Sequence, residues 1–66
     1  MEVYKRGVEV YGLDHVEYTI PYNSIDSLIE AKGGVEYFVK VGNMNIPIRK
    51  EEFFELKALF IEWLGR

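Results

Sequence analysis

Apolar and polar residues alternate through most of the first fifty residues, a period of two that is typical of strands with one buried face. The pattern is clearest in residues 35–41, where four apolar side chains share one face and Glu36, Phe38 and Lys40 share the other. Four further segments are candidate strands: residues 2–5, 8–12, 15–20 and 44–49. The side chains expected on the buried face are Val8, Val10, Val16, Tyr18, Ile20, Val35, Tyr37, Val39, Val41, Met44, Ile46 and Ile48. This alternation predicts an antiparallel sheet with one buried and one solvated face.

Turn residues separate the candidate strands. Gly42-Asn43 suits a two-residue hairpin turn, and residues 12–14 suit a turn between the second and third candidate strands. Pro47 lies inside the last candidate strand and has no N–H group to donate. We therefore expect that strand at an edge of the sheet.

Residues 21–34 are compatible with two kinds of secondary structure. Ile25, Leu28 and Ile29 follow the spacing of a helix face, and Ser24 is a suitable N-cap. The same segment also alternates in the manner of a strand, but less regularly. The local pattern favours a short helix within residues 24–32, and a strand is the alternative.

The last segment, residues 51–64, has the features of a helix. Glu51 and Glu52 lie in its first turn, where the helix dipole favours acids, and Gly65 follows its end. The residue before it, Lys50, is not a preferred N-cap. The whole chain is thus expected to be an α+β fold: a five- or six-stranded antiparallel sheet with strands within residues 2–49 and one C-terminal amphipathic helix packed on one face.

This helix is more apolar than packing on a sheet requires. Glu51, Glu55 and Glu62 form a narrow polar arc when the side chains are placed at about 100° per residue. The apolar stripe opposite this arc contains Phe53, Leu56, Phe60, Trp63 and Leu64. A second apolar flank beside the stripe contains Phe54, Ala58 and Ile61. The stripe can cover the sheet, so the second flank needs another cover.

We expect that cover to be a second copy of the chain. In this interpretation the protein is a homo-oligomer, most simply a dimer, with Phe54, Ala58, Ile61 and Trp63 on the self-association surface. The alternatives are a sheet that curls around both flanks, another partner protein, and a membrane surface. The membrane is least favoured, because membrane-surface helices carry Lys and Arg on their polar face and this one carries Glu.

Length and composition narrow the possible functions. A chain of 66 residues corresponds to one domain, residues 1–66, whose core supplies only about 3–5 kcal/mol. Because there is no Cys and only one His, we expect no disulfide, metal or cofactor. The net charge of −3 disfavours nucleic acid as a general partner. No apolar run is long enough to span a membrane or act as a signal core, so we expect a cytoplasmic protein without a membrane span.

No group of residues suggests catalysis. Asp14 and His15 are adjacent, but no known spacing joins them to a nucleophile, and the pair is typical of a turn. Glu51, Glu52 and Glu55 are better explained as the solvated start of a helix than as acid/base partners. The sequence therefore predicts a non-catalytic interaction or assembly module that self-associates.

The solvated face of the predicted sheet offers an alternative function. Five aromatic and basic side chains are expected to point outward there: Tyr11, His15, Phe38, Lys40 and Arg49. Aromatic rings that stack on bases and cations that contact phosphates are the groups that single-stranded nucleic-acid binders use. The competing interpretation is ordinary cross-strand packing among salt-bridging charges.

Two resemblances bear on these alternatives. Residues 20–28, IPYNSIDSL, followed by a glycine turn, VEYFVKV, MNIPIR and a closing amphipathic helix, resemble the small prokaryotic pleckstrin-homology-like domains over roughly residues 7–64. That family consists of binding and assembly modules, and the resemblance implies a strand at 24–31 and a sheet with an open edge. Residues 44–64 are also similar to the last strand and helix of the single-stranded-DNA-binding transcriptional coactivator family, positive cofactor four, whose small dimers bind DNA on their sheets.

Overall fold

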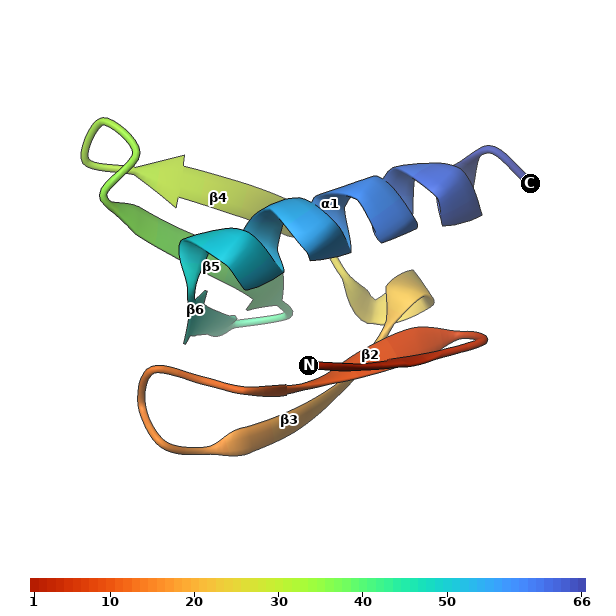
Figure 1. The fold of residues 1–66 in the computed structure, drawn as a ribbon, viewed down its shortest axis with the longest axis horizontal. Coiled ribbons are helices and arrows are strands. Elements are labelled where there is room, and N and C mark those ends of the chain that lie inside the picture. Colours follow the sequence, from red (N-terminus) through yellow and green to blue (C-terminus); the bar gives the residue numbers. More distant parts are fainter.

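The computed structural model contains two three-stranded antiparallel sheets and one long helix at the C-terminal end (Figure 1). The elements follow in the order β1 (Glu2–Tyr4), β2 (Gly7–Tyr11), β3 (Glu17–Pro21), the 3₁₀ helix η1 (Tyr22–Ser24), β4 (Ser27–Ala31), β5 (Glu36–Val41), β6 (Met44–Ile48) and α1 (Lys50–Leu64). Each sheet is a meander, β1-β2-β3 in the first and β4-β5-β6 in the second. The expected α+β class, with antiparallel strands and a C-terminal helix, is confirmed.

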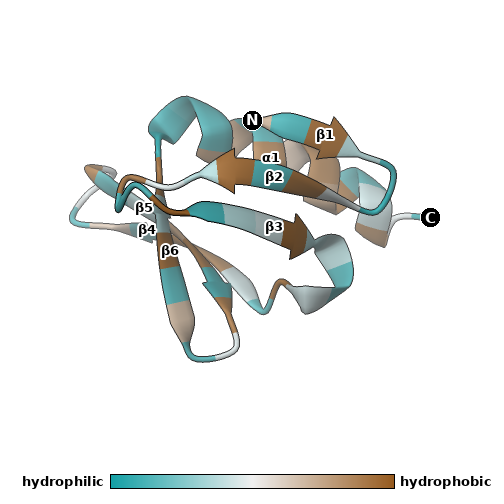
Figure 2. Cartoon of the chain, turned by 90° about the horizontal axis from the view of Figure 1, so that it is seen from below, coloured by the Kyte–Doolittle hydropathy of each residue, from teal (hydrophilic) through white to brown (hydrophobic).

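The expected single sheet of five or six strands is not confirmed, because the chain leaves the first sheet at η1. The N–H group of Tyr22 donates to the carbonyl oxygen of Arg6 at 2.9 Å, which ends β3 against the β1–β2 turn. Tyr22 and Ile25 are both buried, so the connection turns inward. The strands that follow build a second sheet, which crosses the first at a steep angle (Figure 2).

Residues 27–31 form a strand, so the prediction of a short helix in this region is wrong. The N–H group of Asp26 donates to the carbonyl oxygen of Lys40 at 2.9 Å, and Ser27 then pairs with Lys40 at the start of the β4–β5 ladder. Pairing with the neighbouring strand β5 thus decides the structure of a segment whose apolar spacing is compatible with both a helix and a strand. The strand that the pleckstrin-homology-like resemblance implied lies in this place.

The core lies between the inner faces of the two sheets and α1. Its eleven buried residues are Val8, Val10, Ile20, Tyr22, Ile25, Tyr37, Val39, Ile46, Ile48, Phe53 and Leu56. The alternation in β2, β5 and β6 is therefore confirmed at the strand centres. Three side chains that were expected inside are exposed instead, Val16, Val35 and Met44. Each lies at or just before the first residue of a strand, next to a turn.

The β5–β6 hairpin turns at Gly42-Asn43, as predicted. Gly42 has φ +60° and Asn43 does not have a positive φ, which is the combination of a type II′ turn. β6 is an edge strand, also as predicted, and Pro47 pairs with Phe38 on β5. On the free side of β6, the carbonyl oxygen of Pro47 accepts a hydrogen bond from the N–H group of Leu13 at 2.9 Å. The β2–β3 loop thereby joins the two sheets.

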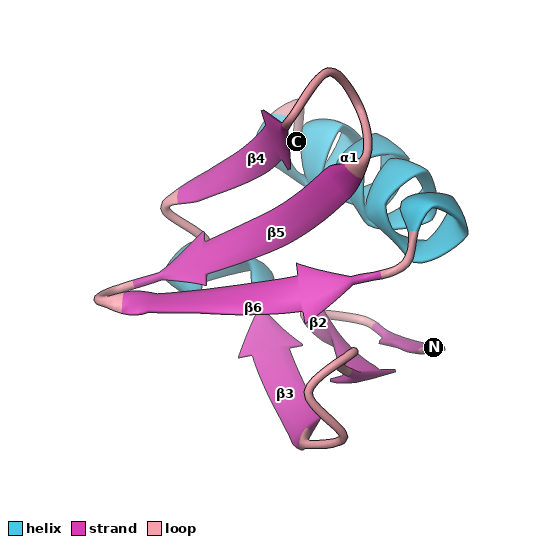
Figure 3. Cartoon of the chain, turned by 90° about the vertical axis from the view of Figure 1, so that its left-hand side faces the viewer, coloured by secondary structure: helices cyan, strands magenta, loops and turns pink.

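The helix α1 lies across one face of the second sheet, in front of β5 in Figure 1 and beyond it in Figure 3, and it lies above the first sheet in both views. Arg49 is its N-cap, with extended backbone and no side-chain cap, and Gly65 ends it without adopting a left-handed conformation. Phe53 and Leu56 are the helix residues that enter the core. No helix has the length and apolar character that crossing a membrane requires.

Candidate interaction surfaces

The outward face of α1 carries the second apolar flank, which we call the helix stripe: Phe54, Ala58 and Ile61. Phe54 is 42 % exposed and Ile61 is 58 % exposed, and Ala58 between them is exposed as well. Apart from one side of the Phe54 ring, which packs on Tyr37 of β5, both sheets leave the helix stripe exposed. Within one chain, therefore, the sheets do not curl around the helix to cover it.

Phe54 is held in place from below by two aromatic rings. Its ring centroid lies 5.6 Å from that of Tyr37 and 5.3 Å from that of Phe53, both in edge-to-face geometry. Tyr37 and Phe53 are themselves buried and lie 4.8 Å apart. The exposed Phe54 side chain is thus held in one orientation by its neighbours. A partner that binds it therefore loses little free energy in restricting its motion.

Trp63 differs from the other residues predicted for self-association. Its indole ring is partly buried against the core, 5.8 Å from the ring of Tyr22 and stacked on Phe60 at 6.0 Å. Trp63 thus lies on the covered side of α1 and not in the helix stripe. Leu64, which was expected on the covered side, is 60 % exposed.

The five residues predicted for a nucleic-acid face are divided between the two sheets. Tyr11 and His15 belong to the end of β2 and its loop, with ring centroids 6.0 Å apart. Phe38 and Lys40 lie on β5, and Arg49 precedes α1 with a guanidinium nitrogen 3.5 Å from the carboxylate of Glu52. The structure therefore does not place all five on one continuous sheet face.

Two of these five residues, Phe38 and Arg49, do lie close together, in a shallow groove that the sequence did not predict. The groove has a volume of about 440 Å³ and lies at the corner where the β2–β3 loop meets β6. It is lined by Leu13, Gly34, Val35, Glu36, Tyr37, Phe38, Pro47, Ile48, Arg49 and Lys50. The exposed Leu13 and Val35 make it partly apolar. Nothing in the alternation pattern indicated that these distant segments would meet.

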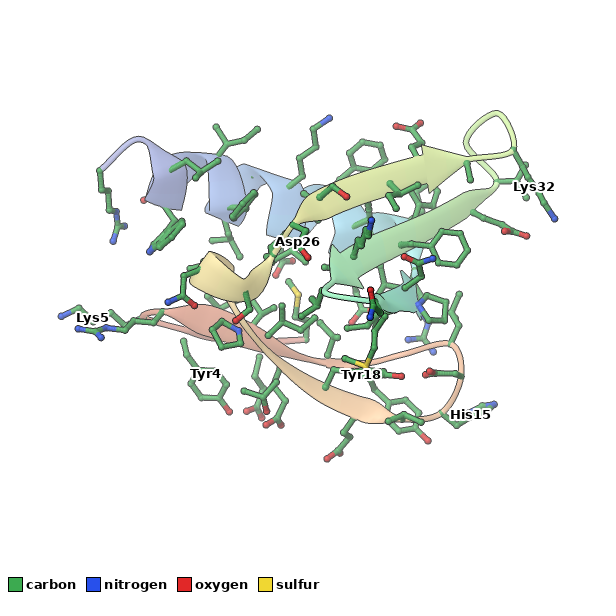
Figure 4. The ribbon with its side chains drawn as sticks, turned by 180° about the vertical axis from the view of Figure 1, so that it is seen from behind. Tyr4, Lys5, His15, Tyr18, Asp26 and Lys32 are labelled. Carbon is green, nitrogen blue, oxygen red and sulfur yellow. The ribbon has the colours of Figure 1, made fainter.

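Asp14 and His15 form a turn, as predicted. The carboxylate of Asp14 accepts hydrogen bonds from the N–H group of Val16 at 3.2 Å and from the hydroxyl of Tyr18, and His15 has a left-handed φ of 65°. Figure 4 shows His15 pointing outward at the loop end of the first sheet, opposite Lys5 at its other end. The Asp14 carboxylate therefore stabilises the loop instead of orienting the imidazole.

Hydrogen bonds to carboxylates also fix the protonation of two tyrosines, the exposed Tyr4 and the half-buried Tyr18. The hydroxyl of Tyr4 donates to Glu2 at 2.6 Å, which raises the pKa of Tyr4 to about 12. The hydrogen bond to Asp14 raises the pKa of Tyr18 in the same way. Both phenols therefore remain protonated hydrogen-bond donors at neutral pH, and neither supplies a base.

The chain was compared with protein-family models, with curated proteins and with solved structures. No family model, no curated protein and no solved structure matches the chain.

Proposed function

We propose that this protein is a non-catalytic assembly module that forms a homodimer through the helix stripe. The observation that carries the proposal is an apolar surface, Phe54, Ala58 and Ile61, that follows one side of α1 and remains uncovered within the chain. Exposed apolar residues are common singly, but a contiguous patch with polar borders is typical of protein–protein contacts.

Small size supports the same proposal. A domain of 66 residues has a core worth only about 3–5 kcal/mol, and it has no disulfide to add to that. Association with a second copy raises the stability of the folded state by mass action. The resemblance of residues 7–64 to pleckstrin-homology-like binding and assembly modules points in the same direction.

The proposal is tested by the mass of the protein in solution. Light scattering should give the mass of two chains at high concentration and a mixture of one and two chains on dilution. Ile61→Glu places a charge in the middle of the contact, so this variant should have the mass of one chain at concentrations where the parent protein is a dimer. Phe54 is less suitable for the test, because its ring also packs on Tyr37.

Val35→Glu is the matched control. Val35 is also β-branched and is 77 % exposed, but it lies outside the helix stripe. Its replacement adds the same charge without touching the proposed contact, so this variant should keep the mass of the parent protein. If the parent protein has the mass of one chain from micromolar to millimolar concentration, the proposed function is wrong.

A further inference from the structure

The charged residues that border the helix stripe are sorted by sign. At about 100° per residue, Glu51, Glu55 and Glu62 fall along one border of the stripe. Lys50 and Lys57 fall along the other border. All five side chains are exposed. The outward face of α1 therefore has an acidic side, an apolar centre and a basic side.

Most of these charges have no partner within the chain. The four ion pairs of the structure leave Lys50, Glu51, Glu55 and Lys57 unpaired, and only Glu62 has a partner, Arg66, at 3.0 Å. Charges that neither pair within the chain nor enter its core are available to a partner. The positions of these charges along the helix stripe therefore indicate which partner surface has complementary charges.

The spacing of the stripe is that of a short coiled-coil seam. Phe54, Ala58 and Ile61 are four and three residues apart, which places them at positions d, a and d of a heptad. Glu55 and Glu62 then occupy positions e, and Lys50 and Lys57 occupy positions g. Positions e and g are those whose charges set partner and orientation in paired helices.

Symmetry decides how two such helices can face each other. If the two-fold axis is perpendicular to the helices, they are antiparallel, and the acidic border of one faces the acidic border of the other. If the two-fold axis runs along the helices, they are parallel, and each acidic border faces a basic one. We propose that the second copy binds with its α1 parallel to that of the first; this inference rests on the proposed self-association and specifies its geometry.

The parallel arrangement predicts particular ion pairs. Lys50 pairs with Glu55 of the partner subunit, and Lys57 pairs with Glu62 of the partner subunit, and each pair occurs twice by symmetry. Two effects oppose it: the helix dipoles are aligned, and Glu51 faces its own copy at one end of the seam. Both effects act at solvated helix ends, where water and salt screen them.

Engineered cysteines measure the orientation directly, since the chain has no Cys of its own. Glu51 and Gly65 are the positions a at the two ends of the seam, about 21 Å apart along the axis. A Cβ at Gly65 meets only carbonyl oxygens at 3.6 Å, so Gly65→Cys fits the structure. In the parallel dimer, Glu51→Cys and Gly65→Cys should each form a disulfide with its own copy under mild oxidation.

An antiparallel dimer gives the opposite result. Neither variant then forms a disulfide with itself, because its cysteines lie at opposite ends of the seam, but an equimolar mixture of the two variants does. That result would overturn the parallel geometry and leave the proposed self-association intact. A protein of monomer mass that forms no disulfide in any combination would overturn both. The two failures are therefore distinguishable.

Charge reversal tests the ion pairs independently. Lys57→Glu turns two attractions into repulsions and should weaken dimerisation about tenfold, and Glu62→Lys should do the same. The double variant Lys57→Glu/Glu62→Lys restores the pairs in exchanged form and should return to within about threefold of the parent Kd. Lys40→Glu, a reversal on the exposed side of β5, is the control and should leave the Kd unchanged. A double variant weaker than either single variant would overturn the pairing.

Discussion

At the scale of single residues, Gly7 is the position at which a side chain would disturb the fold most directly. It is the first residue of β2 and pairs with Tyr4 on one side and Pro21 on the other. A Cβ added there would lie 2.8 Å from the Cα of Pro21 and closer still to the carbonyl oxygen of Ile20. Its backbone is not left-handed, so what the fold requires here is space and not a special conformation.

We expect Gly7→Ala to lower the free energy of unfolding by about 1–3 kcal/mol, because backbone atoms of β3 have to move to admit the methyl group. Urea unfolding followed by circular dichroism measures the change. Gly65→Ala is the control: its Cβ has ordinary contacts, and Ala favours a helix end with this backbone, so its stability should equal or slightly exceed that of the parent protein. Equal midpoints for Gly7→Ala and the parent protein would contradict the prediction.

At the scale of the elements, strand β4 depends on a contact that no local pattern contains. The carboxylate of Asp26 accepts a hydrogen bond from the N–H group of Gly42 at 2.6 Å, while its backbone N–H donates to Lys40. Figure 4 shows Asp26 at the start of β4. One residue thus joins the entry of β4 to the β5–β6 turn, and this contact helps a segment with helical spacing to become a strand.

Asp26→Ala should lower the free energy of unfolding by about 1 kcal/mol, since it removes the acceptor of the Gly42 N–H group. The same change should speed hydrogen exchange of that N–H group and of its neighbours at the β5–β6 turn. Asp26→Asn retains an acceptor oxygen at the same place, and we expect it to recover most of the lost stability. An alanine variant with the exchange rates of the parent protein would show that Asp26 does not anchor the turn.

The elements also show how far the sequence alone could predict the fold. Alternation located the strand centres correctly, because Val39 and Ile46 are buried by periodicity that any one-sided sheet imposes. It did not reveal the division into two sheets, since alternation says which face is buried and not which strands pair. The helical period placed the helix stripe on the exposed side of α1. It left Trp63 assigned both to the covered stripe and to the self-association surface, and the structure shows this residue on the covered side against Tyr22, forty-one residues away in the chain.

At the scale of the whole molecule, the proposed dimer would couple folding to association through α1. The same helix contributes Phe53 and Leu56 to the core on one side and carries the helix stripe on the other. A partner that covers the stripe holds the helix in place, and the helix in turn covers the core between the two sheets. The stability of this small domain should therefore depend on how much of it is dimeric.

If the protein is the proposed dimer, its unfolding temperature depends on protein concentration. For a folded dimer that unfolds to separate chains, a hundredfold rise in concentration should raise the Tm by about 10 °C, provided that both concentrations exceed the Kd. Differential scanning calorimetry at the two concentrations measures the shift. Ile61→Glu, which cannot pair, should show the same Tm at both. A parent protein whose Tm is equally independent of concentration, although light scattering finds it dimeric throughout, would mean that the chains separate before they unfold and that the dimer contact adds no stability to the core.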